Sequence, residues 1–401
     1  MPDTLTKTRP ETKAAVTPAA SPSILQINPP LPTAPEIRAL AGDIQARLKL
    51  AFAMAAAGRT PAGAKGGDEL FARIVASRPA AGKQRLQAKA RAMLDAPRAT
   101  RESFFGRYGA VEPARYTGLA MVHASVGPVA VDGKKLKAAL EAVGKNDAAR
   151  MHLEAVHSTA SEVKIVRKKQ PQDTGQKSAA QLDAEAGAKF KHLSLYLNKV
   201  KCLNTTDGEA GSDEIAMGGT ATNPSGETTK ISQFLVYDDF DKDDRRAYGG
   251  AGKRLHRWNI PVNNNWPHTY AAVLVMAEKD EGGFGDFLKA LWDYIDEEVK
   301  SAVAGAVGAA IGAALGSFFG PLGTALGALT GILVGLFIDW LIGLFEDDLI
   351  AARTIILYLG AATKSYYDQC GLTADPAPRF TIDYNGDGGH YRTWFSLAVE
   401  A

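Results

Sequence analysis

The chain has 401 residues, of which 46% are hydrophobic and 22% charged, and only two are cysteines. This length predicts two or three domains, and the composition excludes a small disulfide-stabilised scaffold and a wholly disordered chain. The net charge of +2 hides an asymmetry, because residues 1–180 hold 28 Lys and Arg against 15 Asp and Glu, which leaves 18 against 29 in residues 181–401. The two parts therefore carry +13 and −11. Such a division indicates either different charged partners or two solvated surfaces that attract each other.

The first 35 residues contain eight prolines and few large apolar side chains. Because such a segment cannot bury enough apolar surface to offset its chain entropy, we predict a disordered leader over residues 1–35. The leader has no apolar core of the kind found in secretory signals. We therefore expect the protein to stay in the cytoplasm of the producing cell until a specialised route exports it to a target membrane.

A basic helical domain is predicted over residues 36–160. Ile37, Leu40, Ile44 and Leu48 recur at helical spacing, and shorter helical patterns follow around 69–77, 83–94 and 133–143. The domain has few aromatic residues and no nucleic-acid signature, so we expect it to bind secretion or loading machinery or anionic lipid, and not nucleic acid. A stretch without periodicity predicts a linker over residues 161–188.

Beyond residue 189 the apolar period changes to two, which is typical of strands. Leu193, Leu195 and Leu197 alternate with polar residues, and similar runs occur at 213–221, 229–237, 253–259, 268–277, 379–384 and 390–399. These short strands predict an antiparallel β-sandwich over residues 189–401, interrupted by an apolar helical hairpin inserted at about 284–370. The expected fold class is α+β and multidomain, with the helical domain at the N-terminal side.

The predicted insertion contains 38 consecutive residues, from Ser301 to Ile338, without a charged residue or histidine. A turn at 320–323 divides them into 302–319 and 322–338, each near the lower limit for crossing a bilayer. Glycines recur every fourth residue along both arms, at Gly308, Gly312, Gly316, Gly320, Gly323, Gly327, Gly331 and Gly335. This spacing resembles the glycine-zipper segments of bacterial pore-forming toxins and membrane channels. The resemblance implies a membrane hairpin that self-associates along its glycine faces.

Three interpretations of the hairpin remain open: conditional insertion from a soluble form, a permanent membrane anchor, and a buried hairpin that serves as core or oligomer interface. Glu346, Asp347 and Asp348 close the apolar run. These carboxylates would oppose entry into an anionic membrane at neutral pH, and protonation or a bound cation would reduce that cost.

If consecutive strands alternate in direction, the loops after the first, third and fifth predicted strands lie at one end of the sandwich. All three are acidic, and their carboxylates predict a Ca²⁺ site. The candidate ligands are Asp207, Asp213, Glu214, Asp239, Asp241, Asp243 and Asp280. In its architecture the arrangement resembles calcium-dependent, lipid-binding C2 domains. Because the hairpin would leave from this end, cation binding and membrane approach would be coupled.

No residue pattern predicts catalysis. The seven histidines form no HExxH pair, neither Cys202 nor Cys370 lies in a nucleophile motif, and 249–254 lacks the spacing of a phosphate loop. His256 and His268 could still meet the acidic loops in the fold. We therefore predict a non-enzymatic, membrane-active effector or pore-forming toxin triggered by Ca²⁺ or low pH. A binding or structural module with the hairpin as buried core is the alternative, and a hydrolase that uses the acidic loops comes third.

Overall fold

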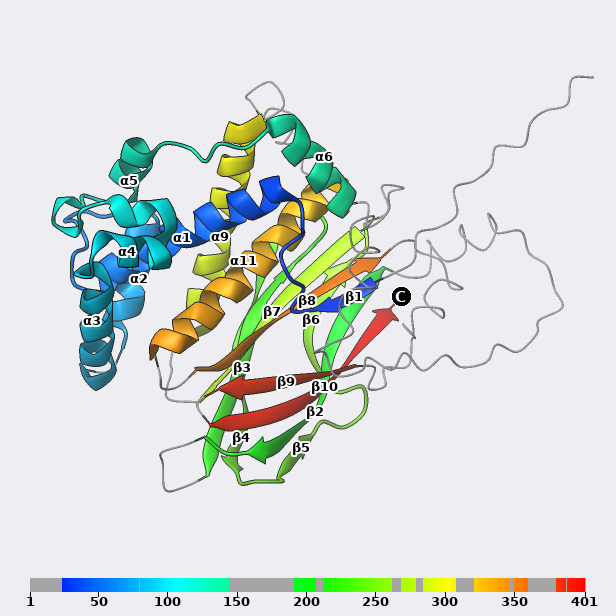
Figure 1. The fold of residues 1–401 in the computed structure, drawn as a ribbon. Coiled ribbons are helices and arrows are strands. Elements are labelled where there is room, and N and C mark those ends of the chain that lie inside the picture. Colours follow the sequence, from blue (N-terminus) through cyan, green and yellow to red (C-terminus); the bar gives the residue numbers. More distant parts are fainter. Residues whose placement is uncertain are drawn as a thin grey trace, which may run out of the picture.

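The structure is a computed structural model, which describes residues 24–78, 80–144, 191–206, 212–261, 268–278, 284–307, 321–345, 349–359, 380–386 and 388–400. Helices form one side of the described chain, and two antiparallel β-sheets form the other (Figure 1). The predicted α+β class, with helices first and a strand-rich part after them, is confirmed.

The two sheets contain all strands of the described chain. The first sheet has the order β1-β8-β7-β3-β4, and the second has the order β5-β2-β10-β9, with β6 also paired to β2. The strands are β1 (Ile24–Ile27), β2 (His192–Asn204), β3 (Asp213–Thr222), β4 (Thr228–Phe240), β5 (Arg245–Ala247), β6 (Lys253–Asn259), β7 (His268–Glu278), β8 (Leu349–Leu359), β9 (Phe380–Gly386) and β10 (Gly389–Glu400).

Strand β7 shows how the first sheet separates two hydrophobic cores. Its side chains alternate between the faces, so that Val273 and Val275 join the core under the helices, whereas Leu274 and Met276 join the core between the two sheets. Residues on both faces are buried because the first sheet is an inner layer of the molecule.

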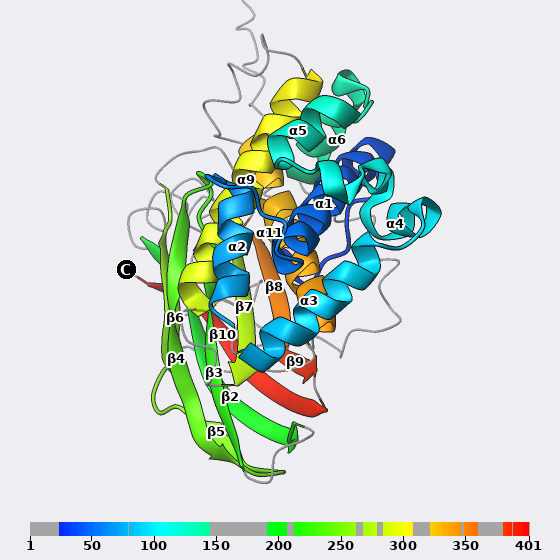
Figure 2. The ribbon, with the colours of Figure 1, turned by 90° about the vertical axis from the view of Figure 1, so that its left-hand side faces the viewer.

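The helices lie on the outer face of the first sheet, in two levels (Figures 1 and 2). α9 (Phe284–Val307) packs on β3 and β4, and α11 (Pro321–Phe345) packs on β7 and β8. The N-terminal helices cover these two: α1 (Pro35–Ala56), α2 (Gly67–Ala76), α3 (Ala80–Leu94), α4 (Arg98–Phe105), α5 (Leu119–Val126) and α6 (Gly133–Gly144), with 3₁₀ turns at Gly106–Ala110 and Pro113–Arg115. We call the helical part from α1 to α6, residues 35–144, the N-terminal cover.

Two predicted boundaries were wrong. The leader was expected to be disordered through residue 35, but Ile24–Ile27 forms β1 and pairs with β8. The helical insertion was expected to reach about residue 370, but Leu349–Leu359 forms β8, between β1 and β7 in the first sheet. The physical reason is that β8 is buried on both faces, and a short continuous apolar run has no period that separates a strand from a helix.

The predicted helical domain also has a different relation to the rest of the chain. Its residues Leu48, Phe52 and Phe71 belong to the same hydrophobic core as Trp292 of α9 and Phe337 of α11. The cover is therefore a layer packed on the inserted helices, without a separate core of its own. The predicted linker at 161–188 lies outside the described residues.

Candidate functional site

The candidate site is α11, whose segment Ala325–Leu344 is the one helix of the described chain that is long and apolar enough to cross a membrane. With 25 residues, α11 is about 37 Å long, compared with about 30 Å for a bilayer hydrocarbon core. In this structure 78% of its most apolar window is buried inside the protein. A membrane helix and the core helix of a soluble protein can share this length and composition, and they differ in the residues that surround them.

The glycines of α11 allow it to approach the first sheet closely. A Cβ atom on Gly331 would lie 3.2 Å from the ring of Trp292, and one on Gly335 would collide with the hydroxyl of Thr354 in β8. That hydroxyl donates to the carbonyl of Gly331 at 3.3 Å. Close packing on the sheet therefore offsets the roughly 0.8–1 kcal/mol that each interior glycine costs a helix.

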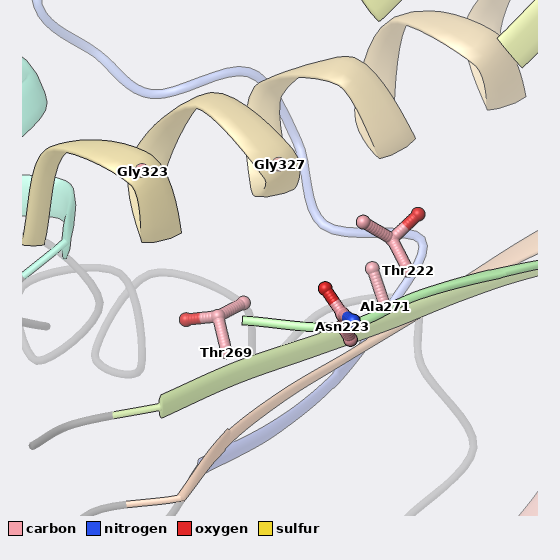
Figure 3. A pocket seen from close by; sticks show the side chains of 6 residues that line it. All are labelled: Thr222, Asn223, Thr269, Ala271, Gly323 and Gly327. Atoms are coloured by element: carbon pink, nitrogen blue, oxygen red, sulfur yellow. The ribbon is translucent and has the colours of Figure 1, made fainter. Parts of the chain in front are cut away.

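The start of α11 lies over the ends of β3 and β7, with room left beside its glycines (Figure 3). A Cβ on Gly327 would meet only the methyl group of Thr222, at 4.0 Å. The narrow gap at this point is lined by Thr222, Asn223, Thr269, Ala271, Gly323 and Gly327. The glycine stripe predicted for the second arm is thus a packing face against α9 and the first sheet. The stripe of the first arm, at Gly308, Gly312, Gly316 and Gly320, lies outside the described residues.

An aromatic cluster joins the opposite side of α11 to the cover. The ring of Phe52 in α1 lies 6.4 Å from Phe337 and 5.8 Å from Trp340, and Phe71 of α2 lies 5.5 Å from Phe337, all between ring centroids. The ammonium group of Lys49 lies 5.5 Å from the centre of the Trp340 ring, and burial lowers the pKa of this lysine. The cover therefore encloses the apolar helix with its own apolar surface.

Two polar contacts hold the cover to the backbone of α11. Gln45 Nε2 donates to the carbonyl of Leu333 at 2.6 Å, and Lys89 Nζ donates to the carbonyl of Leu344 at 3.3 Å. Leu344 is in the last turn of α11, where carbonyl groups lack helical partners and a cation is favourable.

A charged cluster joins the cover to α9. Arg47 of α1 donates to the carboxylate of Glu298, and its other terminal nitrogen lies 3.0 Å from Nδ1 of His123 in α5. The Arg47 side chain is 9% exposed and that of Glu298 is 22% exposed. A guanidinium is always a donor, so Nδ1 of His123 accepts in this contact. Sequence reasoning missed this cluster because its members are far apart in the chain and carry no motif.

A second carboxylate of α9 lies at the contact with α11. Thr330 Oγ1 donates to Asp296 Oδ1 at 3.2 Å, and Lys300 Nζ lies 2.5 Å from Asp296 Oδ2. Burial nevertheless raises the pKa of Asp296. The paired helices thus contain a carboxylate that is more readily neutralised than an ordinary aspartate.

The acidic loops meet at one end of the sandwich as predicted, in so far as they are described. Asp213 pairs with Phe240 at the end of β4, and Ile215 pairs with Glu278 at the end of β7. Protein donors occupy the oxygens of Asp213, which accepts from Thr206 N at 2.8 Å, from Thr206 Oγ1 at 2.9 Å and from the hydroxyl of Tyr391.

The other candidate calcium ligands are separated or used elsewhere. Lys201 Nζ lies 2.6 Å from Asp243 Oδ1 and lowers the pKa of that carboxyl. Asp239 and Asp241 are exposed, and Glu214 follows Asp213 in β3. Among the described residues, no three His, Cys, Asp or Glu side chains are grouped to hold a metal ion. The described carboxylates therefore do not fit a calcium site. Asp207 and Asp280 lie outside the described chain, and Ca²⁺ binding stays a prediction.

The structure also places the two histidines and the hairpin relative to these loops. His268 starts β7 whereas Glu278 ends it, so His268 and the acidic loops lie at opposite ends of an eleven-residue strand. Burial lowers the pKa of both His256 and His268 to about 4, which keeps these rings neutral near pH 7. The hairpin does leave from the acidic end, but α9 then carries the chain back along the sheet toward α6 (Figure 1). The last residues of α9 are therefore remote from the acidic loops.

Comparison with known proteins identifies no relative. No protein-family model matches the chain, and neither a curated protein nor a solved structure is similar to it. The resemblances to glycine-zipper toxins and to C2 domains therefore stay predictions.

Proposed function

We propose that this protein is a non-enzymatic, membrane-active effector that stores an apolar helix under a removable cover. The observation that supports the proposal is α11, which is long enough to span a bilayer and lies between the first sheet and α1. In this proposal the cover separates from α9 and α11, the hairpin enters a target membrane, and copies associate in the bilayer.

Insertion has to be conditional because the covered arrangement is well packed. Transfer of α11 into lipid keeps its own apolar side chains out of water. The cost comes from its partners, because the outer face of β7 and β8 and the apolar side of α1 lose their cover. A trigger must therefore weaken the contacts that the cover makes with α9 and α11.

Acid is the trigger that we propose. α9 carries five carboxylates, in Asp286, Asp293, Asp296, Glu297 and Glu298, and charged carboxylates are costly to bring toward hydrocarbon. Protonation removes such charges, and burial raises the pKa of one of these carboxylates, Asp296, at the contact of α9 with α11. We propose release of the stored protein through a specialised export route, with the target membrane as its site of action.

A second candidate function is a binding or structural module in which α11 remains a core helix. The fit of Gly331 and Gly335 against Trp292 and Thr354 favours it, because this fit explains two of the glycines without any membrane. The two functions differ in what α11 does when lipid is present.

The test uses a surface position of α11. Leu336 is 42% exposed, so lysine is tolerated there in the stored form, yet the same residue lies near the middle of Ala325–Leu344. A lysine at the centre of a membrane helix costs about 2.5–3.5 kcal/mol, which corresponds to roughly 100-fold or more in insertion. Leu235→Lys is the matched control, since Leu235 is 44% exposed and lies in β4.

Dye release from anionic vesicles is measured between pH 4.5 and 7.5, with calcium and with chelator. We expect release at low pH by the wild-type protein and by Leu235→Lys, and a strong loss in Leu336→Lys at unchanged thermal stability. Absence of release by the wild-type protein under every condition, or equal release by both variants, would contradict membrane insertion of α11 and support the core-helix function.

A further inference from the structure

Charge is unevenly distributed along the paired helices α9 and α11. The carboxylates of α9 end at Glu298, and no Asp, Glu, Lys, Arg or His occurs from Ser301 to Ile338. The last two turns of α9 and the first turns of α11 are therefore uncharged. Ser301 and Gly305 are exposed at the end of α9, and a Cβ on Gly305 would meet open space.

α6 packs against both of these helices, α9 and α11, at the edge of the helical layer (Figure 1). A Cβ on Gly133, the first residue of α6, would collide with the backbone of Ala306 near the end of α9. The start of α6 is thus held directly against α9, and the lysines that follow Gly133 have a fixed place beside the uncharged end.

Two of these lysines have no carboxylate partner in the part of the chain that the structure describes. Lys134 and Lys135 are exposed, and Lys137 faces Glu141 at 3.7 Å. The nearest acidic residue in sequence, Asp132, caps the helix, because its Oδ1 accepts from the backbone N–H groups of Lys134 and Lys135 at 3.0 and 3.2 Å. Their ammonium groups are therefore free of a carboxylate partner among the described residues, and they lie on α6 beside the uncharged ends of α9 and α11.

We propose that Lys134 and Lys135, together with the adjoining uncharged ends of α9 and α11, form the surface that docks this protein onto an anionic lipid bilayer. The inference rests on the proposed function, and it adds the orientation of approach. The molecule meets the membrane with the α6 end first, while the acidic loops point away from the lipid. This orientation minimises repulsion, because every carboxylate of α9 lies on the side of Lys300 that is farther from the membrane.

The chemistry of the surface favours lipid over nucleic acid. Nucleic-acid affinity comes from many phosphate contacts, commonly six to ten cationic side chains in a specific complex. This end offers two unpaired lysines beside small and apolar side chains. A pair of cations next to an apolar segment is suited to a membrane interface, where each lysine near an anionic surface contributes about 1 kcal/mol.

The test measures binding of the full-length protein to vesicles by flotation, separately from dye release. At that contribution per lysine, Lys134→Gln with Lys135→Gln should weaken partition into vesicles containing phosphatidylglycerol by about 30-fold. The control replaces two exposed cations near the acidic loops, Lys242→Gln with Arg245→Gln, and should leave partition unchanged. Both double variants change exposed side chains, so their thermal stability should equal that of the wild type.

The outcomes distinguish docking from insertion. Docking that depends on Lys134 and Lys135, without any dye release, would retain this surface and contradict the proposed function. Dye release that stays complete in the lysine variant would contradict the surface and retain insertion. The inference is also wrong if the wild type binds phosphatidylcholine vesicles equally well, if it binds no vesicles, or if the two lysines prove to govern binding to nucleic acid instead.

Discussion

Arg47 donates to the carboxylate of Glu298 across 251 residues of sequence, and this contact joins the N-terminal cover to α9. Both side chains lie largely out of solvent, at 9% and 22% exposure. Their chain neighbours Leu48 and Val299 belong to the hydrophobic core that the cover shares with α9. The intact pair therefore adds little net stability, because each charge loses its hydration on burial. Removal of one partner is destabilising, because the remaining charge is then buried without a counter-charge.

Removal of one member of this pair should destabilise the protein more than removal of both. Glu298→Gln leaves the Arg47 guanidinium without a carboxylate and should lower the free energy of unfolding by about 3 kcal/mol. The combination of Arg47→Met with Glu298→Gln should cost less than either single change, and therefore less than their sum. Urea denaturation of the four proteins checks this. Additive losses would show that the pair does not couple the cover to α9.

The glycines of α11 should respond differently to alanine. Gly327→Ala should stabilise the protein by up to about 1 kcal/mol, because the new Cβ meets only one methyl group at 4.0 Å and glycine costs helical stability. Gly335→Ala should destabilise it by about 1–3 kcal/mol, because its Cβ collides with the Thr354 hydroxyl.

Thr354→Ala provides the rescue. Removal of the hydroxyl leaves the Thr354 Cβ 3.7 Å from a Cβ on Gly335, which is an ordinary contact. Gly335→Ala should therefore be less harmful in the Thr354→Ala background, as measured by urea midpoints. Equal stabilisation by Gly327→Ala and Gly335→Ala would contradict the close approach of α11 to β8.

Acid should weaken the sandwich through His256. Burial beside Trp258 gives this histidine a pKa of about 4, compared with 6.5 for an ordinary histidine. The unfolded chain binds more protons between these two values, so the stabilising contribution is complete above pH 6.5 and is lost as the pH falls toward 4. The loss amounts to about 3 kcal/mol at most.

His256→Gln should flatten this dependence. The difference in unfolding free energy between pH 7 and pH 4.5 should become smaller by up to that amount, as measured by urea denaturation at both pH values. His268, whose pKa is also about 4, should contribute a similar acid-dependent loss of its own. An unchanged slope in His256→Gln would show that this ring stays accessible to protons in the fold.

Calcium should have little effect on thermal stability. A cation bound at 100 times its Kd would add about 2.7 kcal/mol, or roughly 5 °C or more in Tm for a protein of this kind. The described carboxylates Asp213 and Asp243 already have protein partners. We therefore expect no rise in Tm with millimolar calcium over chelator. A rise that disappears in Asp239→Asn with Asp241→Asn would instead establish the acidic loops as a calcium site.

Sequence periodicity was sufficient to predict most of the helices and strands. The alternation of Leu193, Leu195 and Leu197 predicted β2, and the helical spacing from Ile37 to Leu48 predicted α1. The strand order was not predictable to the same extent. β8 has no alternation because both of its faces are buried, and β1 has only four residues, too few for a period to be recognised.

By itself, the amino-acid sequence determined that the chain is α+β, that its charge is divided, and that one segment is apolar enough to enter a membrane. Only the tertiary structure decided that Gly331 and Gly335 face Trp292 and Thr354, and that Arg47 meets Glu298. The physical reason is that periodicity is a local property of the sequence, whereas packing joins distant segments. Periodicity records which face of an element is apolar, whereas the partner of that face is set by packing between segments that lie hundreds of residues apart in the chain.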